Sequence, residues 1–229
     1  MKPKETRLRP CGGRRTQLYR LSLEYSGLES AKWVSQADFA IGGENELHKQ
    51  LTAITNVLNC MLKFNVRKII FASCQSVYGT SKETIITENH PQTPFNAYAR
   101  SKQLIEKTID LYKNAYGIEY VIMRYFTIAG SSEDLKLGEL RKPELSYIPK
   151  LIDAIYFNRP KLPSADLDQT IAPGTIIRDI THVQDIAEAN FRAVEYLREG
   201  KNSDTFNICS AQGISNADIL KNLQEITGK

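Results

Sequence analysis

The sequence predicts an α/β fold in which helices and parallel strands alternate along the chain. Two apolar runs rich in β-branched residues, at residues 66–73 and 119–125, have the length and composition of buried strands. Apolar residues recur at helical spacing between residues 44 and 64 and again between residues 104 and 112. The order helix, strand, helix, strand favours parallel strands joined by right-handed crossovers.

Length and composition are those of a globular protein. The chain has 229 residues, of which 41% are hydrophobic and 24% are charged. No apolar run approaches the roughly 20 residues that cross a membrane, and none follows the basic start as in a secretory signal. We therefore expect a cytoplasmic protein with no membrane partner.

The positive charge is concentrated at the start of the chain. The formal net charge is +4, and residues 1–20 are strongly basic while the remainder is nearly balanced. The basic start is typical of a nucleic-acid arm, a transit peptide or a solvated tail, but no strong basic field remains elsewhere, so no nucleic-acid partner is expected. Four cysteines and three histidines without paired spacing predict neither a disulfide framework nor a metal site.

Local signals divide the chain into three segments. Residues 1–43 form an atypical N-terminal segment, because no G-x-G-x-x-G motif follows an apolar strand there. Residues 44–130 form the sheet domain: a helix ending near Asn65, a strand with a polar end at residues 74–79, a loop, a helix ending at Gly117, and a second strand. Residues 131–229 are mainly a smaller lobe, with elements that return to the sheet.

The smaller lobe is predicted from weaker patterns. Residues 147–157 read as a helix with Pro149 in its first turn, and residues 175–178 as a short strand. A helix over residues 183–197 and a strand over residues 205–208 follow, with His182 expected as a hydrogen-bonding group at the helix start. The spacing Ser215-x-x-Asp218 is that of a capping box and predicts a final helix.

Tyr98 and Lys102 are the first candidates for chemistry. If a helix runs through them, the two side chains stand one turn apart on one face. The cation favours phenolate, so a phenol with an ordinary pKa of about 10 can act as a base closer to neutral pH. The same spacing also occurs by chance, with a surface lysine beside a half-buried tyrosine.

Ligands of open α/β sheets bind at the carboxyl ends of the strands, near residues 73–78 and 125–130 here. Such a pair suits proton removal from a sugar or alcohol hydroxyl while a nicotinamide accepts the hydride.

Five sequence blocks resemble the extended short-chain dehydrogenase/reductase family, and within it the UDP-glucose 4-epimerase branch. They cover residues 44–229 and read FASCQSVYG at 71–79, PFNAYARSK at 94–102, MRYFTIAG at 123–130, IRDITHVQDIA at 177–187 and FNICSAQGIS at 206–215. The resemblance implies a Rossmann-like doubly wound parallel sheet, with an incomplete first βαβ unit and a smaller α/β substrate-binding lobe. It also implies NAD as cofactor, a UDP-sugar as substrate, and a homodimer formed through a helix bundle.

The same resemblance assigns roles to individual residues. Tyr98 would be the base, Lys102 its electrostatic partner, and Cys74 would stand where the family has a catalytic Ser or Thr. The implied cofactor contacts are Ser73, Tyr98, Lys102, Tyr125 and Phe126, and the implied substrate contacts are Thr127, Pro149 and Arg178. The implied reaction is epimerisation of a UDP-hexose at C4 through a transient 4-keto sugar.

Two departures from the family pattern keep a second class of function open. The glycine-rich turn that holds the pyrophosphate is not found in residues 1–43. The thiol of Cys74 is a weak donor and a weak acceptor, although Ser73 or Ser76 could take part in the proton relay instead. The alternative is therefore an inactive remnant, or a nucleotide-sugar-binding protein without a complete NAD site. A 4,6-dehydratase is disfavoured, because Gln75 and Ser76 stand where that family has Asp and Glu.

Overall fold

A three-stranded parallel sheet forms the centre of the larger part of the protein. The computed structural model describes residues 44–81, 83, 85–139, 147–156 and 177–228. Strands β1 (Lys68–Cys74), β2 (Glu119–Tyr125) and β5 (Asp204–Ile208) lie in the order β1-β2-β5, and both pairings are parallel. In this register Cys74 is level with Tyr125 and Tyr125 with Ile208. The carboxyl ends of all three strands therefore meet at one edge of the sheet, and the predicted parallel pairing is confirmed.

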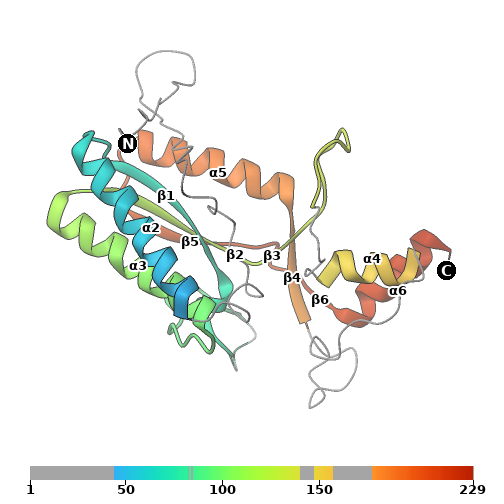
Figure 1. Cartoon of the computed structure of the whole chain (residues 1–229). Coiled ribbons are helices and arrows are strands. Elements are labelled where there is room, and N and C mark those ends of the chain that lie inside the picture. The colour runs from blue at the N-terminus through green and yellow to red at the C-terminus, as the bar shows by residue number, and fades with distance from the viewer. Residues whose placement is uncertain (1–43, 82, 84, 140–146, 157–176, 229) are drawn as a thin grey trace, which may run out of the picture.

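Helices cover both faces of this sheet (Figure 1). Helices α2 (Glu44–Lys63) and α3 (Ala97–Tyr116) lie side by side on one face, and α5 (Val183–Arg198) lies on the other. Since side chains alternate along a strand, β2 sends Tyr120 and Ile122 toward α2 and α3 and sends Val121 and Met123 toward α5. This alternation explains why β2 is apolar along nearly its whole length.

The helix ends follow local chemistry that the sequence shows. Asn65, just after α2, has a φ of 55°, the left-handed conformation that asparagine tolerates. Helix α3 begins where the Asn96 side chain accepts a hydrogen bond from the Ala99 amide and ends at Gly117, whose φ is 70°. Ser215 and Asp218 form the predicted capping box at the start of α6 (Asn216–Thr227).

A second, smaller sheet joins the first to two further helices. Strand β3 (Thr127–Ala129) pairs in parallel with β4 (Ile177–His182), which pairs antiparallel with β6 (Gly213–Ser215). Helices α4 (Tyr147–Tyr156) and α6 pack together beyond this sheet, on the side away from α2 and α3 (Figure 1). His182 caps α5 by accepting a hydrogen bond from the Gln184 amide at 3.2 Å, which confirms its expected structural role.

Two local predictions were wrong. Residues 75–78 form a 3-10 helix, η1 (Gln75–Tyr78), rather than a polar extension of the strand. Strand β4 extends through His182 instead of ending at Arg178, because it has a partner on each side along part of its length. The predicted N-terminal segment 1–43, and the residues 140–146 and 157–176 within the smaller lobe, lie outside the described residues, so the domain boundaries stay a prediction. No helix among the described ranges is long and apolar enough to cross a membrane.

Candidate active site

Tyr98 and Lys102 lie in the first turns of α3, beside the carboxyl end of β1. The Lys102 Nζ is 5.7 Å from the centre of the Tyr98 ring and 5.2 Å from the centre of the Phe71 ring. It also donates a hydrogen bond to the backbone oxygen of Ala72 at 3.3 Å. The helix therefore places the predicted pair on one face and points that face at the strand end.

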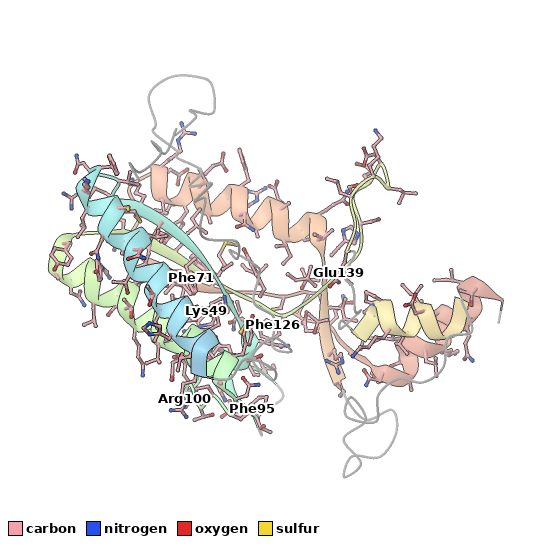
Figure 2. The ribbon with its side chains drawn as sticks, in the orientation of Figure 1. Lys49, Phe71, Phe95, Arg100, Phe126 and Glu139 are labelled. Carbon is pink, nitrogen blue, oxygen red and sulfur yellow. The ribbon has the colours of Figure 1, made fainter. Side chains whose placement is uncertain are left out.

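The ammonium group of Lys102 is held in a largely enclosed position. Burial lowers the pKa of Lys102, while its interactions with Cys74 and Glu106 offset part of that effect. Phe71, which Figure 2 labels within the sheet, supplies one of the two aromatic rings near the ammonium. A positive charge with little water around it acts strongly on a neighbouring phenol.

Cys74 completes the cluster. The Tyr98 side chain hydrogen-bonds to the Cys74 side chain, so the phenol and the thiol are direct neighbours. Burial raises the pKa of the Cys74 thiol, and hydrogen bonds from Ser76 and Tyr98 and the charge of Lys102 counter only part of that shift. The thiol is therefore protonated at neutral pH.

Two of the expected cofactor contacts have their side chains engaged elsewhere. Ser73 is 3% exposed, and its hydroxyl donates to Glu106 on the α3 face of the sheet. The hydroxyl of Tyr125 donates to Asn190 on α5 at 3.0 Å, and burial raises its pKa. Contacts from these two residues to a ligand at the strand ends would have to come from the backbone or the ring. Phe126 follows at the junction of the two sheets (Figure 2).

The expected substrate contacts lie on the second sheet and its helices. Thr127 opens β3 opposite Ile180 of β4, and Pro149 is half-buried in the first turn of α4. Arg178 lies near the start of β4 and donates from Nε to the Asn216 side chain at 3.2 Å. These three residues thus share the smaller part of the protein, whereas Tyr98, Lys102 and Cys74 share the larger part.

Sequence reasoning missed a buried ion pair beneath the cluster. Glu106 and Arg124 are 5% and 6% exposed, and Arg124 Nη2 lies 2.7 Å from Glu106 Oε2. Burial disfavours the charge on Arg124, but the hydrogen bonds and charge of Glu106 outweigh it, so the pKa of Arg124 is raised. The signal was present in the sequence, because an arginine within an apolar strand requires a buried partner.

Comparison with known proteins places these features in a family. A family model described as the NAD dependent epimerase/dehydratase family matches residues 37–209. The chain belongs to this family. It is 38% identical to a UDP-glucose 4-epimerase of Lacticaseibacillus casei over 173 residues, which are 76% of this chain and 52% of that protein. A UDP-glucose 4-epimerase of Streptococcus mutans is 36% identical with the same coverage.

Solved structures of epimerases have the same fold. A UDP-glucose 4-epimerase from Brucella ovis in complex with NAD superimposes with a TM-score of 0.69 at 30% identity, over 77% of this chain and 54% of that one. The Thermotoga maritima UDP-glucose 4-epimerase with UDP-glucose gives a TM-score of 0.70 at 23% identity, over 87% of this chain and 60% of that one, which supports the fold alone. The chain spans about half the length of the curated relatives it matches.

Proposed function

We propose that this chain carries the catalytic part of an NAD-dependent UDP-hexose 4-epimerase. The observation that carries the proposal is the meeting of Tyr98, Lys102 and Cys74 at the carboxyl end of β1. Ligands of open α/β sheets bind at such strand ends. The family is NAD dependent, and relatives with the same fold bind NAD or UDP-glucose according to their structures.

The described residues fit the nicotinamide-ribose half of NAD. Lys102 offers an ammonium group next to Ala72 at the strand end, which suits a ribose hydroxyl, and Tyr98 stands beside it. Phe126 and the backbone at Ser73 and Tyr125 would contribute further contacts. Any group that holds the pyrophosphate would come from outside the described ranges.

In the proposed reaction the phenolate of Tyr98, stabilised by Lys102, removes the proton from the O4 hydroxyl of the sugar. In the reverse step the phenol of Tyr98 returns that proton to O4. NAD, when bound, accepts the C4 hydride and later returns it. Cys74 is proposed to position the phenol in place of a hydroxyl group, since its thiol interacts with the Tyr98 side chain. Return of hydride to the opposite face of the 4-keto sugar inverts the configuration at C4.

The substrate would be held by the smaller part of the protein. Arg178 is proposed to bind the diphosphate of the UDP-sugar, because a guanidinium fork matches phosphate oxygens. Thr127 and Pro149 are proposed to line the same site. A homodimer is proposed as well, formed through the outer faces of α2 and α3.

The first test measures bound cofactor and turnover in the purified chain. Absorbance and mass spectrometry should find NAD(H) near one per chain, and UDP-galactose should be converted to UDP-glucose. Tyr98→Phe should retain the cofactor but lose turnover by about 10²-fold or more, since it removes the proton-transfer group. A chain that binds no NAD at millimolar concentration would instead be a non-catalytic member of the family, and turnover that survives in Tyr98→Phe would remove Tyr98 from its role.

A further inference from the structure

A buried polar network lies directly beneath the candidate catalytic helix and has no part in the proposed chemistry. Glu106 is on α3, one helical turn after Lys102, and Arg124 is on β2. Arg124 contacts both oxygens of the carboxylate, with Nη2 at 2.7 Å from Oε2 and Nε at 3.2 Å from Oε1. This two-point contact fixes both the distance and the orientation between helix and strand.

The network extends from this pair to every neighbouring element. Ser73 at the end of β1 and Gln92 in the preceding loop both donate to Glu106. Arg124 Nη1 donates to the Tyr78 hydroxyl at 2.7 Å, and that hydroxyl donates to Asn207 of β5 at 2.6 Å. One set of hydrogen bonds therefore ties α3 to η1 and to the carboxyl ends of all three strands of the parallel sheet.

Stability alone does not account for such a network. Replacing a buried ion pair with well-packed apolar residues is often neutral or stabilising, because desolvation of the charges offsets their attraction. Apolar packing, however, tolerates small shifts of one element along another, whereas a two-point ion pair does not. Among the described residues, no buried side-chain atom of this network lacks a hydrogen-bond partner, so its geometry is fully determined.

The position of the network along α3 is what links it to the active site. Tyr98, Lys102 and Glu106 are spaced four residues apart, so they lie along the same side of the helix. A shift of α3 by part of a turn at Glu106 would move the Tyr98 hydroxyl away from Cys74 and Lys102 away from Ala72. We propose that Glu106 and Arg124 are positioning residues that hold α3 in the register where Tyr98 and Lys102 meet the end of β1. The positioning role itself is independent of the proposed function, and only the catalytic role of Tyr98 and Lys102 rests on it.

The test compares removal of a carboxylate charge inside the network with the same change on α3 outside it, and measures how each affects Cys74. Glu106→Gln removes the carboxylate charge, and Asp110→Asn makes the same change one turn further along α3, where Asp110 accepts from the Tyr120 hydroxyl. The readout is the alkylation rate of Cys74 by iodoacetamide over a pH series, followed by peptide mass spectrometry with Cys60 of α2 as internal reference. We expect Glu106→Gln to speed alkylation of Cys74 by about tenfold, the factor for a local opening that is easier by about 1.4 kcal/mol, and Asp110→Asn to leave it unchanged.

A double variant separates positioning from structural support. Glu106→Leu with Arg124→Met should still fold, because no buried charge is left unpaired, and loss of the acceptor of the buried Ser73 hydroxyl should lower stability only by the cost of one unsatisfied hydrogen-bonding group. The proposal expects Cys74 to be alkylated in this variant about as fast as in Glu106→Gln, and therefore faster than in the wild type, with a changed pH profile. A wild-type profile in the double variant, or equal effects of Glu106→Gln and Asp110→Asn, would overturn it. The readout needs neither NAD nor turnover, so a failed proposed function and a failed positioning role give different results.

Discussion

Cys74 shows how one side chain can alter a site whose geometry is otherwise intact. It lies at the end of β1 against Tyr98, in a position where a hydroxyl could both donate and accept strong hydrogen bonds. A thiol makes weaker bonds, so the phenol depends more on Lys102 for stabilisation of its ionised form. The ammonium of Lys102 lies 5.7 Å from the centre of the Tyr98 ring and is placed to supply that stabilisation.

The first prediction concerns the reactivity of Cys74 in the folded protein. Burial raises the pKa of this thiol and also that of Cys209, but Cys209 is exposed and therefore more accessible to a reagent than Cys74. At neutral pH, iodoacetamide should modify Cys74 more slowly than Cys209, as quantified by peptide mass spectrometry. In denaturant the two rates should become similar. Equal rates in the folded chain would contradict the enclosed position of Cys74.

The second prediction is a pH dependence of stability that comes from Lys102. Because burial lowers the pKa of Lys102 in the folded state, the unfolded chain binds more protons between that lowered pKa and the ordinary value of about 10.4. The contribution of Lys102 to the free energy of unfolding should therefore rise with pH in this window. Lys102→Met should abolish that rise and stabilise the protein at neutral pH by up to about 1 kcal/mol.

Urea denaturation followed by circular dichroism at several pH values measures this effect. Lys107→Met is the matched control, because Lys107 is exposed on the same helix. A stability curve of Lys102→Met that still rises with pH as in the wild type would assign the rise to another group.

At the scale of elements, helix ends could be predicted from nearby residues. The extent of strand β4 and the pairing of buried side chains could not, because they depend on residues distant in sequence. Asn65, Gly117 and Ser215 act within a few residues of themselves, so the ends of α2 and α3 and the start of α6 could be predicted. Strand β4 alternates polar and apolar residues only weakly and is extended by β3 and β6, which are distant in sequence. The Glu106–Arg124 pair was missed for the same reason, since periodicity does not show which strand residue faces which helix residue.

The third prediction compares two glycines with nearly the same φ. Gly117 after α3 has a φ of 70° and open space where a Cβ would lie, while Gly79 after η1 has a φ of 71° and its Cβ would lie 2.0 Å from the Thr93 carbonyl oxygen. Gly117→Ala should cost about 1 kcal/mol, from the left-handed conformation alone. Gly79→Ala should cost about 3 kcal/mol or more, because its ψ of −147° puts it in a region that essentially only glycine adopts, and a clash is added to that strain.

Chemical denaturation of the two variants measures both losses of stability. Gly117→Asn should recover part of the loss, because asparagine adopts the left-handed conformation more readily than alanine. If Gly79→Ala were as mild as Gly117→Ala, the close approach of the loop at Thr93 to η1 would be wrong.

At the scale of the whole molecule, the outer faces of α2 and α3 form a surface for the proposed homodimer. The exposed positions near the middle of α2 are small or polar, among them Thr52, Ala53 and Asn56, and such residues let two helix pairs approach closely. Sedimentation velocity should find a dimer, and Ala53→Arg should convert it to a monomer without loss of helix content. Lys221→Ala on α6, outside this surface, is the control. A wild-type monomer at micromolar concentration would remove the dimer from the proposal.

The junction between the two sheets has a mechanical consequence. Phe126 alone separates β2 from β3, and its amide donates to the Ile208 carbonyl at 3.3 Å. Within the described ranges the chain crosses the junction twice more, where β4 leads through α5 to β5 and where residues 209–212 lead to β6. A large hinge motion requires connecting segments whose backbone torsion angles can change freely. The repeated connections between the two sheets restrict such changes. A UDP-sugar held at Arg178 and deprotonated at Tyr98 would therefore have to turn over within the site, without help from a large rotation of one sheet against the other.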